Sequence, residues 1–66
     1  MSEGYVVEID SESVGIVVRR DGERVFRFHA STNEFHALDG SVFVSPSAAQ
    51  RAAHELIAMR RAAISK

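Results

Sequence analysis

The chain has 66 residues, no cysteine and a formal net charge of -1. The absence of cysteine excludes a disulfide framework and a thiolate metal site, and the near-neutral charge excludes the broad positive field that draws proteins onto nucleic acid or anionic lipid. A chain of this length has room for a single domain, residues 1–66, and a domain of this size buries only about 60% of the surface that its unfolded chain exposes.

The N-terminus and the apolar runs bear on localisation. The first four residues, Met-Ser-Glu-Gly, contain neither a basic nor an apolar region, and the apolar runs along the chain are only a few residues long. A secretory signal needs both kinds of region, and a membrane-spanning helix needs about 20 apolar residues. We therefore expect a cytoplasmic protein that does not bind membranes and is full length or nearly so.

Residues 5–30 are rich in Val, Ile and Phe and are interrupted by two polar stretches, residues 10–13 and the pair Asp21-Gly22. Apolar runs separated by tight turn signals are typical of antiparallel strands, so this region predicts three strands joined by two hairpins. Because a slip of one residue moves every side chain of a strand to the other face, the hydrophobic pattern constrains the length of each turn.

The pattern predicts a first turn over residues 10–13, which keeps the apolar residues of the first two strands on one face. A three-residue second turn, residues 20–22 with the glycine in the left-handed conformation, pairs Ile16 with Phe26. The inner face expected from these turns consists of Tyr5, Val7, Ile9, Val14, Ile16, Val18, Phe26, Phe28 and Ala30.

Residues 31–40 are polar at both ends but contain two apolar residues spaced three apart, Phe35 and Leu38. This spacing predicts one helical turn that places both side chains under the sheet and ends at Asp39-Gly40. Residues 41–44 predict a short fourth strand. The pattern leaves open both the position of this strand in the sheet and which of its side chains face inward.

Ser45 and Pro46 mark the start of a C-terminal helix. Ser45 suits the N-cap because its hydroxyl can accept a hydrogen bond from a free backbone N–H, and Pro46 suits the first helical position because the N–H it lacks is not needed there. An alanine-rich stripe at helical spacing then predicts a face that packs closely on the sheet. The stripe consists of Ala49, Ala52, Ala53, Leu56 and Ala63, flanked by Ile57, Met59 and Ile64.

The expected registers give the outer face of the sheet, the face away from the helix, a row of three valines flanked by charged residues. The candidate interaction residues are Val6, Val17, Val25, Arg19 and Arg27, and Gly15 is expected to leave this face flat. A solvated sheet explains the row, because Val is a good strand former and Arg19 opposite Glu23 makes an ordinary ion pair. An apolar strip with a charged rim is also typical of a surface that binds a second copy or a protein partner. A third interpretation is that the arginines dock onto nucleic acid, although acidic residues are interleaved with them.

The remaining residue patterns favour no other chemistry. His29, His36 and His54 lack the i, i+4 spacing of a metal-ligand pair, so we expect neither a metal nor a cofactor. The Ser, Thr, Asn and His residues between positions 31 and 36 are as typical of a turn as of a catalytic group. The glycines are scattered instead of forming a phosphate-binding loop. We therefore expect no enzymatic activity.

Residues 43–53 combine a strand that ends in an aromatic residue, a serine and an alanine-rich helix. In this order they resemble the C-terminal part of AP2 DNA-binding domains and of the arm-binding domains of phage integrases. The stretch from Gly15 to Leu56 also resembles short bacterial proteins of uncharacterised function. The chain lacks the run of Arg and Trp that AP2 domains carry on the sheet, so no DNA-contacting residue is carried over, and likeness of fold does not transfer function.

Together these observations predict an α+β fold, with an antiparallel sheet of three or four strands and one C-terminal helix packed on one face. We expect a non-catalytic interaction module that acts through the outer sheet face, either as a homodimer or with another protein. The alternative is a nucleic-acid-binding module that uses the arginines of the sheet.

Overall fold

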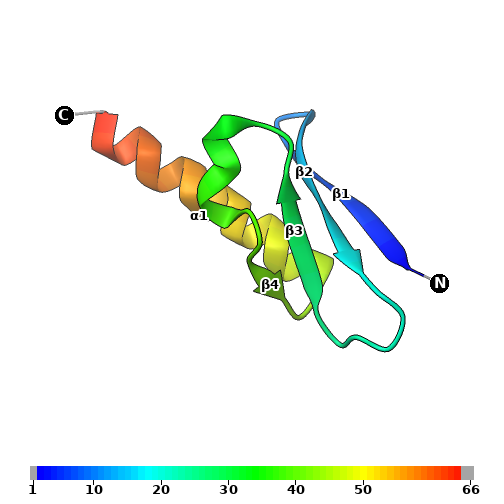
Figure 1. Ribbon diagram of the computed structural model, residues 1–66. Coiled ribbons are helices and arrows are strands. Elements are labelled where there is room, and N and C mark those ends of the chain that lie inside the picture. The colour runs from blue at the N-terminus through cyan, green and yellow to red at the C-terminus, as the bar shows by residue number, and fades with distance from the viewer. Residues whose placement is uncertain (1, 65–66) are drawn as a thin grey trace.

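A computed structural model describes residues 2–64 as one sheet and one helix in two layers (Figure 1). The sheet contains strands β1 (Glu3–Ile9), β2 (Glu12–Arg19), β3 (Phe26–Ala30) and β4 (Val42–Phe43), in that order and antiparallel throughout. A 3-10 helix, η1 (Asn33–Leu38), connects β3 to β4, and helix α1 (Pro46–Ile64) packs across one face of the sheet. The predicted α+β class, with a C-terminal helix on an antiparallel sheet, is confirmed.

The first hairpin turns over two residues instead of the predicted four. Asp10 and Ser11 have positive φ angles of 52° and 69°, as required at both central positions of the type I′ turn that joins twisted antiparallel strands. The pairing of β1 with β2 then shifts between Val7 and Glu8, where Val14 is an extra residue in β2. Because of the short turn and this β-bulge, β1 and β2 pair in a register that differs from the predicted one.

The observed register reverses the two faces of β2. Tyr5 pairs with Val17, whereas Val18 was expected there, and a shift of one residue sends alternate side chains to the opposite face. Val17 is therefore fully buried on the α1 side, and Ile16 is 40% exposed on the outer face. The predicted inward positions of Ile16 and Val18 are wrong.

The inward residues of β1 and β3 agree with the prediction apart from one exposed ring. Tyr5, at the start of β1, is 46% exposed at a corner of the α1 side. Core positions confirmed by the structure are Val7, Ile9, Val14, Phe26 and Phe28, with Ala30 packed against them.

Gly15 explains why β2 takes this register. A Cβ atom at this position would lie 2.5 Å from Cζ of Phe28 and 2.7 Å from the carbonyl oxygen of His29, closer than normal contacts. Only a glycine lets the Phe28 ring lie directly on the β2 backbone, and this ring is completely buried. Gly15 thus lies in the core, and the prediction that it flattens the outer face is wrong.

The loop between β2 and β3 spans residues 20–25 and is longer than the predicted three-residue turn. It turns at Gly22, whose φ of 84° is the left-handed conformation expected for this glycine. Ile16 pairs with His29, so the predicted pairing of Ile16 with Phe26 is wrong.

The connection from β3 to β4 places one aromatic ring in the core. Phe35 is buried in η1, which confirms the predicted helical turn. Asp39 accepts a hydrogen bond from the backbone N–H of Ala30 at 2.8 Å. Its carboxylate thus takes the place of a backbone carbonyl group beside β3, beyond the N-terminal end of β4. In β4, Phe43 packs against the core and Val42 is exposed, which settles the orientation that the sequence left open.

Helix α1 begins as predicted. The Ser45 hydroxyl oxygen accepts a hydrogen bond from the backbone N–H of Ala48 at 3.1 Å. The first half of the helix packs Ala49 and Ala53 against the sheet, and both are completely buried. Its small side chains let the helix backbone lie close to the sheet at β1 and β4.

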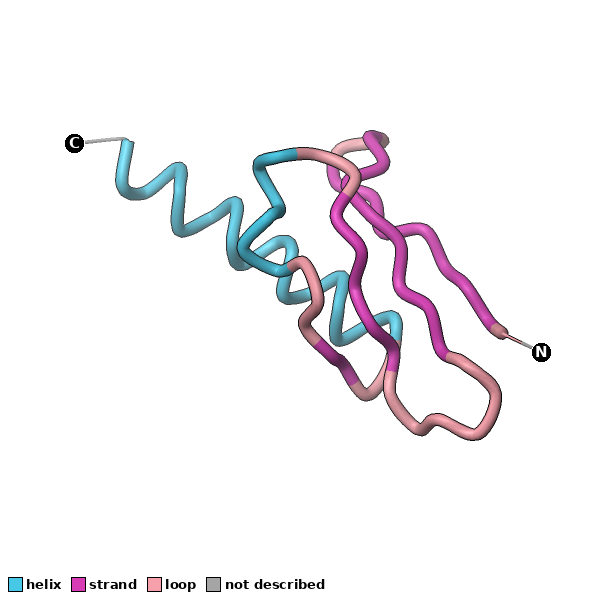
Figure 2. Tube along the Cα trace, viewed as in Figure 1, coloured by secondary structure: helices cyan, strands magenta, loops and turns pink. Residues whose placement is uncertain are grey.

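Leu56 and Ile57 in the middle of α1 pack against the core, and the helix then continues past the sheet (Figure 2). Met59 is 69% exposed and Ala63 is also exposed, so their predicted packing is wrong. The side chain of Ile64, predicted to flank the stripe, lies outside the described residues. None of the helices within residues 2–64 is long and apolar enough to cross a membrane.

The contact between Phe28 and Gly15 predicts a loss of stability when a methyl group is added at Gly15. Gly15→Ala is expected to lower the free energy of unfolding by about 1–3 kcal/mol, the usual range for overpacking a core. Gly4→Ala is the matched control, because a Cβ there meets only the Val17 carbonyl oxygen, at 3.9 Å. Urea unfolding followed by circular dichroism measures both variants, and equal midpoints would contradict the packing.

Candidate functional site

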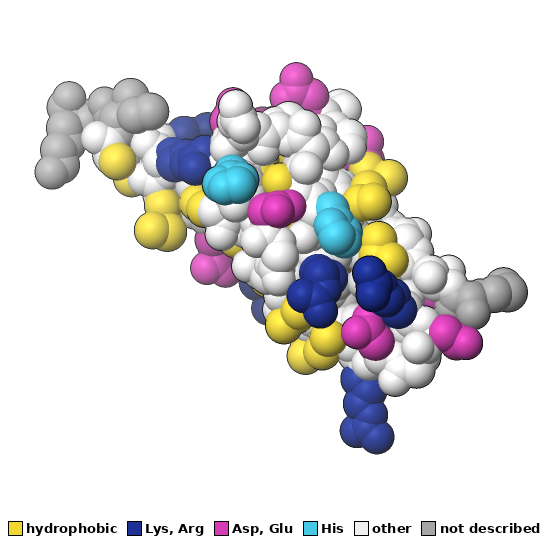
Figure 3. Space-filling view, viewed as in Figure 1, with side chains coloured by type: hydrophobic (Ala, Val, Ile, Leu, Met, Phe, Trp, Pro, Cys, Tyr) yellow, Lys and Arg dark blue, Asp and Glu magenta, His cyan; other side chains and the backbone are white. Residues whose placement is uncertain are grey.

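The outer face of the sheet lies opposite α1 and mixes apolar and charged side chains (Figure 3). The strand residues on this face are Gly4, Val6, Glu8, Ser13, Ile16, Val18, Arg27, His29 and Val42. Val6 is 59% exposed and Val42 is 50% exposed. Aliphatic side chains are thus presented to solvent on the face that α1 does not cover.

One row across this face joins two exposed aliphatic side chains to an imidazole. Val6 pairs with Ile16, and Ile16 pairs with His29 on the next strand. Paired residues on neighbouring strands lie about 4.5–5.5 Å apart, so these side chains touch or nearly touch. The row forms a short apolar strip that ends at the histidine.

Arg27 stands at the centre of the next row, between Val18 and Val42. The side chains of Arg27 and His29 have no hydrogen-bond or ion-pair partner among residues 2–64. A guanidinium group prefers a planar carboxylate or phosphate partner. Because its neighbours on both sides are valines, Arg27 is available to a group from another molecule.

Of the five residues predicted for this face, only Val6 and Arg27 are exposed on it. Val17 is buried on the α1 side because of the register shift, so its predicted place on the outer face is wrong. Val25 is half-buried in the loop before β3 and does not extend a valine row. Arg19 also belongs to the α1 side.

Arg19 is part of a compact cluster on that side. Its guanidinium group forms an ion pair with Glu3, and its central carbon lies 5.3 Å from the centroid of the Phe26 ring. Tyr5 packs edge-on against the same ring, with 5.8 Å between centroids, and donates a hydrogen bond to Glu3 at 3.1 Å. The pair of Arg19 with Glu23 that the sequence predicted is therefore replaced by a pair with Glu3.

Sequence reasoning missed Ile16 and Val18 as outer-face residues. Gly15 was the signal that could have found them, because a glycine inside a strand marks a β-bulge or a close backbone approach. The structure shows both features at this point of β2. A bulge placed beside Gly15 shifts the register by one residue and sends both side chains outward.

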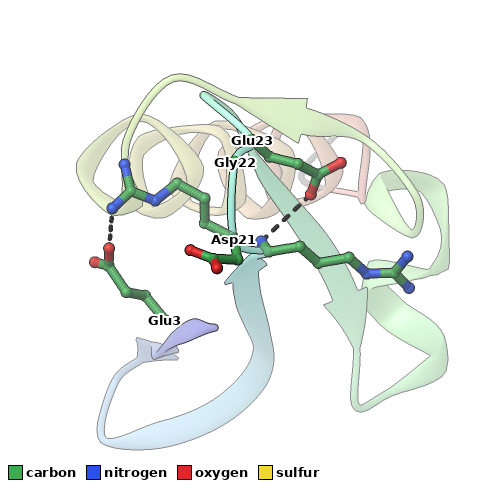
Figure 4. A pocket seen from close by; sticks show the side chains of 6 residues that line it. Glu3, Asp21, Gly22 and Glu23 are labelled. Carbon is green, nitrogen blue, oxygen red and sulfur yellow. Dashed lines mark hydrogen bonds and ion pairs between the residues drawn. The ribbon is translucent and has the colours of Figure 1, made fainter. Parts of the chain in front are cut away.

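A hollow of about 200 Å³ lies between the start of β1 and the loop that follows β2 (Figure 4). It is lined by Glu3, Arg19, Arg20, Asp21, Gly22 and Glu23. Several of its polar groups are already engaged: Glu3 pairs with Arg19, and Glu23 accepts a hydrogen bond from the Arg20 backbone N–H at 3.3 Å. Figure 4 shows both interactions: the first joins β1 to β2, and the second lies within the loop.

A second hollow, of about 230 Å³, lies at the opposite end of the sheet, between the β1–β2 turn, η1 and α1. Aliphatic and aromatic side chains, including Ile9 and Phe35, contribute to its lining. Asp10 and Arg61 form an ion pair at its rim, with 3.4 Å between their atoms. This pair links the first turn to α1.

The histidines lie on separate elements. His29 is in β3, His36 is in η1, and His54 is in α1, where its ring lies 3.1 Å from the side-chain nitrogen of Gln50. Within residues 2–64 there is no group of three or more His, Asp or Glu side chains that could hold a metal ion.

Comparisons of the chain with protein-family models, with curated proteins and with solved structures found no match. The resemblances to AP2 and integrase modules stay predictions.

The reversed faces of β2 predict opposite outcomes for two neighbouring substitutions. Val17→Glu places an unpaired carboxylate in the core and is expected to abolish cooperative unfolding, because the penalty is comparable to the stability of a small domain. Ile16→Glu is expected to unfold cooperatively with a midpoint near that of the wild type, because its side chain lies on the exposed face. Thermal melts followed by circular dichroism distinguish the two, and the reverse result would disprove the register.

Proposed function

We propose that the protein is a non-catalytic interaction module that binds a protein partner through the outer sheet face. The observation that carries the proposal is the position of Arg27, which is exposed and unpaired between Val18 and Val42. Protein interfaces typically combine an apolar centre with arginine and aromatic side chains. The complementary surface is apolar and contains a carboxylate that can reach Arg27.

The charges of the outer face favour a different protein over two stacked copies of this chain. Among the described strand residues on this face, Arg27 and His29 provide the basic groups and Glu8 provides the single carboxylate. Stacking two identical faces about a two-fold axis near Arg27 would bring the two guanidinium groups together, which opposes association. A partner that carries Asp or Glu avoids this repulsion and can bind the guanidinium group through two parallel hydrogen bonds.

Nucleic-acid binding, the alternative hypothesis, needs several arginines on one surface. Arg19 and Arg27 lie on opposite faces of the sheet, and Arg19 is paired with Glu3. Two of the arginines of that hypothesis therefore do not form one patch, so we favour a protein partner.

Site-specific photo-cross-linking in the cells that express the protein tests the proposal. A benzoylphenylalanine residue at Val42, on the outer face, is expected to give a discrete adduct with one protein. The same probe at Glu55, exposed on α1, is the control and is expected to give no such adduct. Arg27→Glu should reduce the Val42 adduct by about tenfold, the effect of losing about 1.4 kcal/mol of binding free energy.

Two results would count against this function. Equal adduct patterns from Val42 and Glu55 would show that the outer face is not a specific binding surface. A Val42 adduct that is unchanged by Arg27→Glu would show that a carboxylate partner for Arg27 is not part of the interface.

A further inference from the structure

Strand β1 forms one edge of the sheet, and a side chain of α1 covers one point of that edge. The backbone N–H of Glu8 donates a hydrogen bond to Oε1 of Gln50 at 3.3 Å, and Nε2 of Gln50 donates one to the Glu8 carbonyl oxygen. The Gln50 amide thus occupies the place of a peptide group from a neighbouring strand. The contact also shows that the backbone groups of Glu8 point away from β2.

Because backbone groups alternate in direction along a strand, those of Gly4 and Val6 point to the same open side as those of Glu8. Within residues 2–64 these outward groups form no hydrogen bond. Natural edge strands are usually protected by lysine, proline or an inward-pointing charge, whereas residues 4–7 are Gly-Tyr-Val-Val. Gln50 therefore protects the edge at Glu8 and leaves the preceding segment open.

The opposite edge of the sheet, formed by β4, has few backbone groups available to pair with another strand. β4 contains only Val42 and Phe43 and is followed by Pro46, the first residue of α1. Short strands and prolines are two common ways of preventing edge-to-edge pairing. The capacity of this sheet to accept another strand is thus concentrated on β1.

We propose that two copies of the chain pair through β1 in antiparallel orientation, with Gly4 of one copy opposite Val6 of the other. Each residue of such a pair exchanges both of its backbone hydrogen bonds with the residue opposite. The two-fold axis then passes beside Tyr5. The outward backbone N–H and C=O groups of Gly4 and Val6 form hydrogen bonds in both copies. The shared segment ends before Glu8, whose backbone groups are already bound by Gln50.

The side chains of residues 3–7 are compatible with this register. On the outer face, Val6 lies beside the partner's Gly4, which has no side chain to obstruct it. On the α1 side, the half-exposed Tyr5 rings of the two copies face each other, and aromatic cross-strand pairs are favourable. Glu3 lies opposite the partner's Val7, and its charge is balanced by Arg19 of its own copy. No like charges are set opposite each other, so a second copy fits the edge.

This pairing is independent of the proposed function because it uses backbone groups at the edge, whereas the partner of the outer face binds side chains. The shared segment is short and buries less surface than a standard interface, so the dimer is weak and dissociates on dilution. The two copies form one continuous sheet, with both α1 helices on the same side.

Sedimentation equilibrium from micromolar to millimolar concentration measures the pairing. The wild-type mass is expected to rise toward that of a dimer. Gly4→Pro removes an outward N–H and places a ring against the partner strand, and proline is tolerated where the N–H of an edge strand faces solvent. It is expected to raise the dissociation constant by about tenfold or more, whereas Ile16→Glu, on the outer face, should leave the constant unchanged.

A cross-link reports the register directly. The chain has no cysteine, so Tyr5→Cys introduces a single thiol at the two-fold axis. The two Tyr5 residues form a non-hydrogen-bonded pair, in which the Cα atoms lie about 4.5 Å apart. This distance is within the range for a disulfide. In a glutathione redox buffer this variant is expected to form covalent dimers, and Val44→Cys, which is more exposed but lies outside β1, should remain monomeric.

Three results would overturn the edge dimer. The first is a wild-type chain that remains monomeric at millimolar concentration. The second is a dimer that survives Gly4→Pro and is lost in Ile16→Glu, which would identify face-to-face stacking. The third is cross-linking of Tyr5→Cys no greater than that of Val44→Cys.

Discussion

The Phe28 ring lies directly on the β2 backbone at Gly15, and the orientation of the sheet residues depends on this contact. With any larger residue at Gly15, the ring and the strand could not approach so closely. The contact fixes which face of β2 points toward α1, and Val17 is buried as a result. The same choice sends Ile16 outward, so the composition of the exposed face follows from a constraint in the core.

Local signals were enough to predict much of the fold. The N-cap of α1 at Ser45, the left-handed conformation of Gly22 and the helical turn around Phe35 each depend on residues near in sequence, and each is confirmed. The register of β2 depends instead on a contact between Gly15 and a residue of the next strand, which is not a local property. Because hydrophobic residues occur consecutively at positions 16–18, either face of β2 could be turned inward without exposing an unusual pattern. The sequence therefore predicted an exposed, partly apolar face opposite the helix, but most of the apolar residues assigned to that face were wrong.

Helix α1 seals the sheet unevenly. Ala49 and Ala53 pack on the core, and Gln50 reaches the edge of β1. The corner around Tyr5 is covered by other side chains. There, Arg19 and Phe26 stack and Glu3 pairs with the arginine, so charged side chains cover an aromatic ring at this corner. Leu56 and Ile57 still pack against the core, whereas Met59 and Ala63, farther along α1, are exposed. The helix thus stabilises one end of β1 and leaves the other end open.

The open edge and the exposed face meet at Val6, whose backbone points to the edge and whose side chain lies on the outer face. Pairing of two copies at this edge would place their outer faces side by side, with the row of Val6 and Ile16 in one copy continued by the row of Gly4, Val18 and Arg27 in the other. A weak dimer of this kind needs no change in either copy, yet it presents two equivalent Arg27 sites in one plane. A partner that carries two acidic sites at matching spacing would then bind more tightly than a partner with one, because its second contact forms at a high effective concentration. In such an arrangement a short strand pairing, which is weak alone, and a small binding face, which is also weak alone, reinforce each other through linkage.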